Sequence, residues 1–241
     1  MDVVYVVKYD PENNSEELRY SLRSLKNLPH GNVVIVGEKP DWVTNVTYIP
    51  VAQTKTKREN VTMNLLAAIN SELVSDDFML MNDDFFIMKE LSEMPILNFG
   101  PLADVIAYYN HRYPEGSEYI SNMTKLYNLL IERGNERPMS YELHTPMILN
   151  KKNVQSLYTE PKEPFYQFRT YYGNFFNIGG TSVRDVKVFT EPQHNDARYN
   201  SNPREYLEGQ TFLSVTGGSF KRGVPGDFVR EKLNEKSIYE L

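Results

Sequence analysis

Two adjacent carboxylates, Asp83 and Asp84, follow an apolar run at residues 78–81 and precede another at 85–87. Because a buried carboxylate loses its hydration, such a pair is costly unless a cation neutralises it. A divalent cation there would also bridge the phosphates of a nucleotide diphosphate. The alternative is a solvated turn or a helix N-cap, where Asp makes local hydrogen bonds. The chain has no cysteine, so we expect oxygen ligands and Mg²⁺ or Mn²⁺ at Asp83 and Asp84.

A basic stretch at residues 55–58 contains Lys57 and Arg58 and precedes a predicted helix. Side chains and free backbone N–H groups at a helix N-terminus bind phosphate well. The alternative is a solvated basic face. We treat Lys57 and Arg58 as candidate nucleotide-binding residues.

Arg19 and Arg23 lie four positions apart, and hence on one face of a predicted helix next to the first strand–helix turn. One role is contact with a phosphate or a base at the mouth of the sheet. The other is surface ion pairing with Glu16 or Glu17. Spacing alone leaves both roles open.

His144 and Arg169 are candidates for the reaction itself. His144 lies between apolar residues and proline, and a histidine with a pKa near neutrality is a suitable general base for a hydroxyl acceptor. Arg169 offers the planar fork that binds phosphate oxygens bidentately. The alternatives are a structural histidine and a packed structural arginine.

Strands and helices alternate in the first half of the sequence. Pro29 ends the first helix, which Ser15 begins as its N-cap. Strands separated by single helices predict a parallel sheet covered on both faces, with the ligand site beyond the carboxyl ends of the strands. The predicted strands are Val3–Val7, Asn32–Gly37, Val46–Val51 and Asp77–Met81, and the helix after residue 58 carries Leu65, Leu66, Ala68 and Ile69.

The second half is less regular. We predict helices at Leu102–Tyr109 and Ser121–Arg133, an extended segment at Tyr141–Leu149, and a helix beginning at Asp227. With no internal repeat and no low-complexity linker, the prediction is one α/β domain over residues 1–241. Residues 1–90 would form its nucleotide-binding half, and residues 91–241 its acceptor and catalytic half.

Composition sets the outer limits. The 241 residues carry a net charge of −6, which argues against tight nucleic-acid binding. No segment reaches the roughly 18 consecutive apolar residues that a transmembrane helix needs, and the N-terminal apolar run lacks the basic segment of a signal peptide. Without cysteines there is no disulfide partner. These features predict a cytoplasmic protein.

Several short motifs occur along the chain: Glu16–Leu25, Pro40–Val43, Met81–Phe86, Leu143–Met147, the Phe168-Arg169 pair and Lys236–Glu240. Their sequences and their order resemble the conserved regions of the Stealth family of sugar-phosphate transferases. The acidic pair expected in the family's fourth region is replaced here by Thr216-Gly217-Gly218-Ser219. Short glycosyltransferase-like proteins encoded by bacteriophages resemble the chain most.

The resemblance implies a GT-A-like core, a UDP-sugar donor, a divalent metal at Asp84, and catalytic roles for His144 and Arg169. The expected reaction is transfer of a sugar to a hydroxyl group of a glycan, a protein or a modified base. One alternative is Stealth-type transfer of a sugar 1-phosphate, which releases UMP. Another is a carbohydrate- or nucleotide-binding module without activity. For a phage-encoded protein, the expected location is the host cytoplasm.

Overall fold

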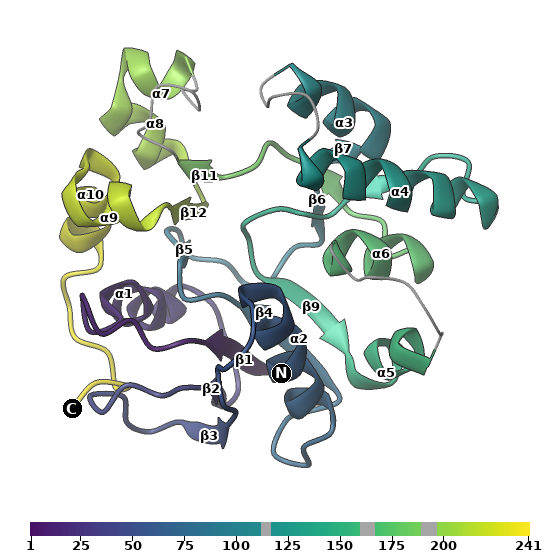
Figure 1. Cartoon of the computed structure of the whole chain (residues 1–241). Coiled ribbons are helices and arrows are strands. Elements are labelled where there is room, and N and C mark those ends of the chain that lie inside the picture. Colours follow the sequence, from purple (N-terminus) through teal and green to yellow (C-terminus); the bar gives the residue numbers. More distant parts are fainter. Residues whose placement is uncertain (112–116, 160–166, 189–196) are drawn as a thin grey trace. The chain divides into compact units, whose positions relative to one another are not determined.

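A five-stranded sheet with the order β3-β2-β1-β4-β9 organises the first part of the computed structural model, which describes residues 1–111, 117–159, 167–188 and 197–241 (Figure 1). The first four strands run parallel, and β9 runs antiparallel to β4. This arrangement confirms the predicted α/β fold with a mainly parallel central sheet. The strands are β1 (Asp2–Val7), β2 (Val33–Gly37), β3 (Thr47–Pro50), β4 (Asp77–Met81) and β9 (Met147–Asn150).

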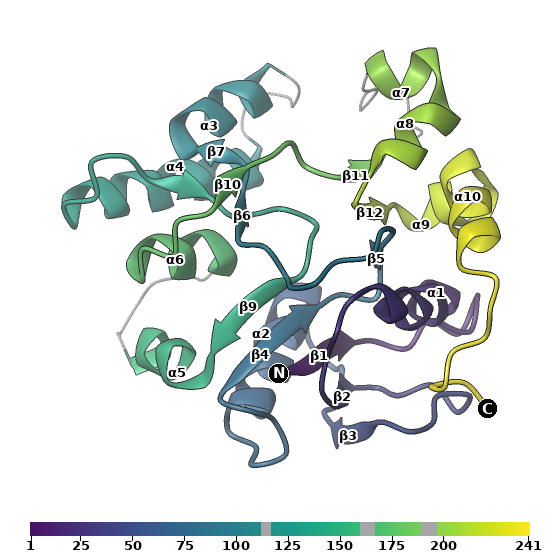
Figure 2. The ribbon, with the colours of Figure 1, turned by 180° about the vertical axis from the view of Figure 1, so that it is seen from behind.

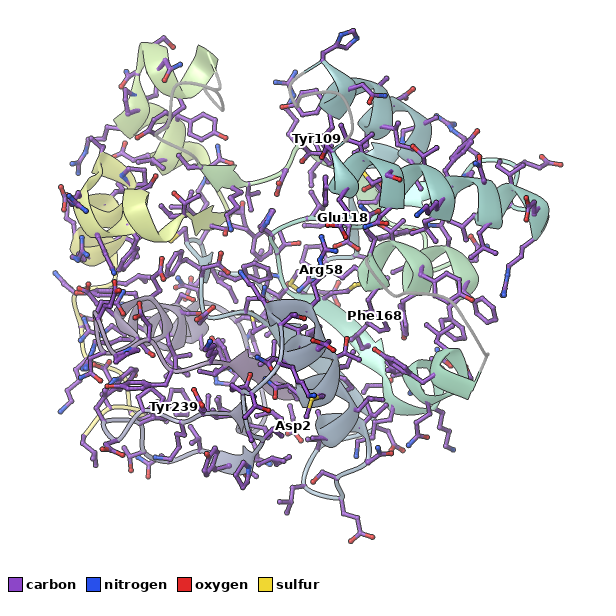
Figure 3. The ribbon with its side chains drawn as sticks, in the orientation of Figure 1. Asp2, Arg58, Tyr109, Glu118, Phe168 and Tyr239 are labelled. Atoms are coloured by element: carbon purple, nitrogen blue, oxygen red, sulfur yellow. The ribbon has the colours of Figure 1, made fainter. Side chains whose placement is uncertain are left out.

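β1 is fully buried because both of its faces are covered, which is why its sequence is continuously apolar after Asp2. Helix α1 (Glu16–Ser24) buries Leu18 and Leu22, and helix α2 (Lys57–Ile69) packs on β1 and β2. At the amino edge of the sheet, the buried Asp2 carboxylate accepts hydrogen bonds from the backbone N–H groups of Asn32 (3.0 Å) and Ser75 (2.8 Å) (Figure 3). Asp2 therefore ties the starts of three neighbouring strands together.

A second sheet with the order β11-β12-β5 continues from the end of β4. β5 (Phe85–Ile87) runs antiparallel to β12 (Phe212–Val215), and β11 (Lys187–Val188) runs parallel to β12. Between β11 and β12, the chain forms α7 (Ala197–Ser201) and α8 (Pro203–Gly209). After β12 come α9 (Gly217–Arg222) and α10 (Val224–Lys232).

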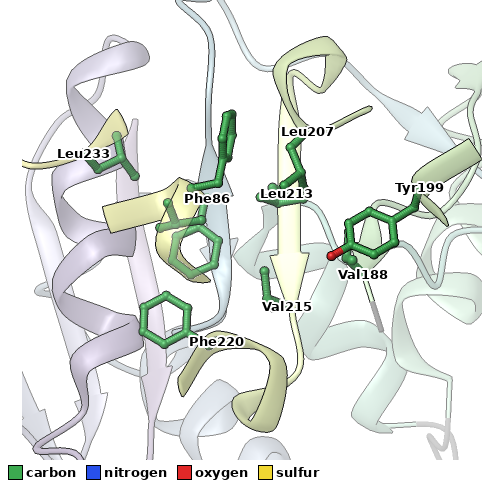
Figure 4. Close-up of a cluster of buried hydrophobic side chains, with 10 residues drawn as sticks. Phe86, Val188, Tyr199, Leu207, Leu213, Val215, Phe220 and Leu233 are labelled. Atoms are coloured by element: carbon green, nitrogen blue, oxygen red, sulfur yellow. The ribbon is translucent and has the colours of Figure 1, made fainter. Parts of the chain in front are cut away.

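A buried apolar cluster joins this second sheet to helices α7 to α10 (Figure 4). Phe86 of β5 and Phe220 of α9 stack with their ring centroids 5.8 Å apart and their planes 9° from parallel. Leu207, Leu213 and Val229 in the same cluster are completely buried. Because Phe86 anchors β5 here, the turn that carries Asp83 and Asp84 is held at both of its ends.

The C-terminal segment returns to α1 and to the loop that follows β2. The backbone N–H of Thr44 donates to Tyr239, and that of Leu241 donates to Trp42, both at 2.9 Å. The last residues of the chain therefore pack beside α1. Figure 2 shows this segment from the opposite side.

The chain forms two compact units. The first contains Met1–Met94, His144–Gln155 and Val186–Leu241, and the second contains Pro95–Leu143 and Ser156–Asp185. The predicted division of function near residue 90 remains a prediction. Helix α5 (Lys151–Thr159) follows β9. The helices of the second unit are α3 (Leu102–Asn110), α4 (Glu118–Glu132) and α6 (Phe168–Phe175). Two short sheets accompany them: β6 (Leu97–Asn98) pairs with β10 (Thr181–Ser182), and β7 (Gly100–Pro101) pairs with β8 (Met139–Ser140).

The predicted helices and strands of the first half are present, with boundaries that differ from the prediction by at most four residues; β4 has the predicted bounds. Ser15 is the N-cap residue of α1, but it has φ 51° and its side chain does not cap the helix. Its hydroxyl instead accepts a hydrogen bond from the Asp10 backbone N–H at 3.0 Å. Among the helices of the described residues, none is both long and apolar enough to cross a membrane.

Candidate functional site

The topology of the first unit brings four loops to the carboxyl edge of its main sheet. β1 and β4 are parallel neighbours, so the residues after Val7 and after Met81 emerge side by side. β9 is antiparallel to β4, so the residues that precede it, including His144, reach the same edge. The segment after β3 leads to the N-terminus of α2. Sequence-distant polar groups therefore meet where a doubly covered parallel sheet binds its ligands.

A cavity of about 810 Å³ lies at this edge, within the first unit. Four of the predicted site residues line it: Lys57, Asp83, Asp84 and His144. Other lining residues that the sequence analysis did not assign are Lys8, Glu17, Gln53, Asn60, Asn64, Lys187 and Gly217.

Asp84 is the most firmly held of these groups. Lys187 Nζ lies 2.8 Å from its Oδ2 atom, and the Ser214 hydroxyl donates to the same oxygen at 3.1 Å. Strand register explains both contacts, because Ser214 pairs with Phe85 on one side and with Lys187 on the other. Burial alone would raise the pKa of Asp84, but Lys187, His144 and Ser214 outweigh it and lower that pKa. Asp84 is therefore a carboxylate at neutral pH.

Asp83 differs from its neighbour. Burial and the charge of Asp84 raise the pKa of Asp83 to about 7, and Lys57 and Lys187 offset only part of this effect. Among the described residues, no lysine, arginine or histidine forms an ion pair with Asp83. The Asp83 carboxylate is thus available to a cation or to a ligand in the cavity.

Glu17 is a site residue that sequence reasoning missed. It faces the cavity from the first turn of α1, and its buried Oε1 atom lacks a hydrogen-bond partner within the described part of the chain. Burial, followed by the charges of Asp83 and Asp84, raises the pKa of Glu17 to about 7. Gly217 leaves space beside it, since a Cβ at that position would lie 3.9 Å from Oε1. The sequence did not single out Glu17, because acidic residues are common in the first turn of any helix, where they interact favourably with the helix dipole.

His144 lies at the start of the segment that leads into β9. Its ring meets Phe85 edge to face, with centroids 6.2 Å apart and an interplanar angle of 83°. Its charge is one of those that lower the pKa of Asp84. The predicted base and the predicted metal-binding carboxylate therefore share one cavity.

The basic stretch does lead into a helix. α2 begins at Lys57 and is started by a capping box, in which Thr56 Oγ1 accepts from the Glu59 backbone N–H (3.4 Å) and the Glu59 carboxylate accepts from the Thr56 backbone N–H (3.0 Å). Lys57 lines the cavity, whereas Arg58 is exposed on the next position of the helix.

Replacing the capping residue gives a modest, testable effect. We expect Thr56→Ala to reduce the free energy of unfolding by about 1 kcal/mol, because the Glu59 backbone N–H loses the Thr56 hydroxyl that accepts its hydrogen bond. Urea denaturation measures it. Thr54→Ala, two residues earlier on an exposed position, should change the free energy of unfolding by less than about 0.5 kcal/mol. Equal losses in the two variants would contradict the capping role.

Arg19 and Arg23 bind neither Glu16 nor Glu17. Arg19 Nη1 donates to Glu240 at 2.9 Å, and Arg23 donates to the same carboxylate through Nε (2.8 Å) and Nη2 (2.9 Å). The expectation that they share one helix face was right, but the ion-pair partner is the C-terminal segment. Their role in binding a nucleotide stays a prediction.

Arg169 belongs to the second unit, where it is 9% exposed. It lies on α6, and its Nη1 atom donates to the Leu143 carbonyl at 3.4 Å. The neighbouring Thr170 side chain accepts from the Tyr141 backbone N–H at 3.0 Å. Its catalytic role remains a prediction.

The donor set suits a hard divalent cation that shares its coordination with a ligand. No three Asp, Glu or His side chains form a metal-binding group among the residues with described positions. Mg²⁺, however, is commonly held by one or two carboxylates together with substrate phosphates and water. The unpartnered Glu17 oxygen and the raised pKa of Asp83 both reflect an excess of negative charge. Asp83 and Asp84 therefore fit such a cation.

Comparison with known proteins leaves the family open. No protein-family model matches the chain, and no curated protein matches it. Among solved structures, the galactosyltransferase LgtC, crystallised in complex with donor and acceptor sugar analogues, aligns with a TM-score of 0.48 and 10% identity. The alignment covers 98% of this chain and 96% of that chain. At this level of similarity, the likeness does not identify a function.

Proposed function

We propose that this chain is a metal-dependent glycosyltransferase with a GT-A-like core that uses a UDP-sugar donor. One observation carries the proposal: the adjacent carboxylates Asp83 and Asp84 follow a central parallel strand and line a cavity of about 810 Å³ together with Lys57 and His144. Carboxylates paired with lysines suit a cation–diphosphate complex better than an uncharged ligand. The motif order shared with the Stealth family supports the choice of a nucleotide sugar.

The proposed residues divide into three roles. Asp83 and Asp84 would hold Mg²⁺ or Mn²⁺, which supplies charge stabilisation to the departing diphosphate. Lys57 and Arg58, with Arg19 and Arg23, are proposed to contact the nucleotide. Arg169 is proposed, from the family resemblance alone, to neutralise phosphate charge.

The transfer step needs one base. The acceptor hydroxyl oxygen bonds to the anomeric carbon of the sugar, and its proton passes to His144. The bond between the anomeric carbon and the diphosphate oxygen breaks, and UDP leaves with the electron pair. His144 suits this role because it is one of the residues that line the cavity and is only half-buried.

The resemblance also favours a second reaction at the same site. In sugar-phosphate transfer, the hydroxyl oxygen bonds to the β-phosphorus, and the bridging P–O bond breaks so that UMP leaves. The two reactions differ in their nucleotide product. Chromatography of the nucleotides released from a UDP-sugar decides between them, since UDP indicates glycosyl transfer and UMP indicates sugar-phosphate transfer.

A thermal-shift screen of UDP, GDP, CMP and TDP with Mn²⁺ tests the donor class. At a ligand concentration about one hundred times its Kd, binding stabilises the native state by about 2.7 kcal/mol. For a chain of this length, we expect UDP with Mn²⁺ to raise Tm by roughly 5–10 °C. UDP in EDTA should raise it less. No shift with any of the four nucleotides would refute the proposal, and binding without donor turnover would indicate an inactive binding module.

A further inference from the structure

Lys187 is a charged residue of the site that the sequence analysis did not single out. It lies on the two-residue strand β11, and its ammonium is 2.8 Å from Asp84 Oδ2. Its side chain is 16% exposed, whereas the other two lysines that line the cavity, Lys8 and Lys57, are exposed. Lys187 is therefore built into the wall of the cavity.

The acids around the cavity outnumber the cations that face them. Asp10 and Glu12 have a partner in Lys221, whose Nζ is 4.0 Å and 3.1 Å from their carboxylates. Glu17, Asp83 and Asp84 remain as a second group, and the charge of Lys187 lowers the pKa of each of the three. Lys187 thus acts as the counter-ion of this carboxylate group.

A divalent cation and a diphosphate would both disturb this arrangement. A cation on Asp84 repels an ammonium that occupies the same carboxylate oxygen, since like charges a few ångströms apart in a partly buried site interact strongly. A diphosphate attracts that ammonium. The lysine stem is long and flexible enough to exchange one anionic partner for another.

We propose that Lys187 exchanges partners on donor binding: it neutralises Asp84 in the empty site and moves to the donor diphosphate when a divalent cation takes Asp84. This inference rests on the proposed function and adds to it a phosphate-binding residue that competes with the metal. Asp84 then faces a positive charge in both states: the Lys187 ammonium in the empty site and the divalent cation in the donor complex. Lys187 likewise faces an anion in both states.

Two separate titrations test the exchange. In the first, Mn²⁺ alone is titrated into the nucleotide-free protein. In the second, UDP is titrated at saturating Mn²⁺, with uridine as the matched ligand that has no phosphates. The variants are Lys187→Met, which removes the charge, Lys187→Arg, which keeps it, and Lys89→Met, a control whose exposed lysine donates to the Gly209 carbonyl.

We expect Lys187→Met to bind Mn²⁺ about tenfold more tightly and UDP about tenfold more weakly, since one unit charge is removed near both ligands. Uridine affinity should not change. Lys187→Arg and Lys89→Met should resemble the wild type. The gain in Mn²⁺ affinity of Lys187→Met shows that its weaker UDP binding is not caused by misfolding.

The outcomes separate the inference from the proposed function. If the wild type binds Mn²⁺ and UDP but Lys187→Met leaves both affinities unchanged, the exchange is wrong and the donor site stands. Weaker Mn²⁺ binding in Lys187→Met would also overturn it, because the lysine would then support the metal site instead of competing for it. If the wild type binds neither probe, the proposed function and the inference fail together.

Discussion

Asp84→Asn should reduce the rate of nucleotide release from a UDP-sugar at least about a hundredfold, while Tm stays within a few degrees of the wild type. The loss follows because the metal's charge stabilisation of the leaving diphosphate is worth several kcal/mol, and a neutral amide holds the cation poorly. Tm changes little because the lost contacts with Lys187 and Ser214 are offset by relief of repulsion from Asp83 and Glu17.

The matched control is Asp76→Asn. It makes the same change of charge at an exposed residue that precedes β4 at its other end. The rate at which Asp76→Asn releases nucleotide from a UDP-sugar should stay within about twofold of the wild-type rate, because substitutions at exposed positions have small effects. If both variants lose activity equally, or if Asp84→Asn remains fully active, Asp84 does not hold a catalytic cation.

Glu240→Gln should be the most destabilising of the proposed substitutions. The Glu240 side chain is 0% exposed and pairs with Arg19 and Arg23, which are 27% and 12% exposed. It also accepts from the Ser237 backbone N–H at 2.9 Å. Removing one member of a buried ion pair costs about 3–5 kcal/mol. Because Arg19 keeps some access to water, we expect a loss of about 2–3 kcal/mol, or roughly 4–12 °C in Tm.

The same contacts predict how the effect depends on pH. Burial would raise the pKa of Glu240, but hydrogen bonds from Arg23, Ser237 and Arg19 outweigh it and lower the pKa to about 2. Because the pKa of Glu240 in the folded state lies below the unfolded value of 4.5, its ionised carboxylate contributes its full stabilisation above pH 4.5. That stabilisation is lost as the pH falls from 4.5 toward about 2. Urea denaturation at pH 7 and at pH 3 should therefore show that the difference in free energy of unfolding between Glu240→Gln and the wild type is smaller at pH 3.

Glu235→Gln is the control on the same C-terminal segment. Glu235 and its partner Lys26 are 77% and 46% exposed, and exposed pairs contribute at most about 1 kcal/mol. The arginine contacts do not anchor the C-terminus if Glu240→Gln lowers the free energy of unfolding no more than Glu235→Gln does. The same conclusion follows if the loss in Glu240→Gln does not depend on pH.

The strand that precedes Asp83 and Asp84 was predictable because its signal is local. An apolar run that is interrupted by two acids and resumes with Phe85 favours a buried strand followed by a polar turn. The alternation of strands and helices then fixed a mainly parallel sheet, and with it the edge at which a ligand binds.

The surroundings of Asp84 could not be predicted, because they come from short, distant strands. Lys187 and Ser214 lie 103 and 130 positions from it in the sequence. β11 has only two residues, too few to show a periodic pattern. Their pairing depends on how β5 meets β12, which is a tertiary contact.

The arginines of α1 show the same limit. Their spacing placed Arg19 and Arg23 on one face, as observed, but Glu240 lies 221 and 217 positions away. A basic helix face next to a strand–helix turn can bind a phosphate group or the side-chain carboxylate of a residue such as Glu240 equally well. Only the fold of the C-terminal segment gives these arginines their partner.

The central claim is that Asp83 and Asp84 form a metal-dependent site for a nucleotide diphosphate. Calorimetric titration of UDP with and without Mn²⁺, into the wild type and into Asp84→Asn, tests it most directly. We predict that the wild type binds UDP at least about tenfold more tightly with Mn²⁺, and that Asp84→Asn loses this dependence on metal. Equal UDP affinity in the two proteins in the presence of Mn²⁺ would contradict the claim.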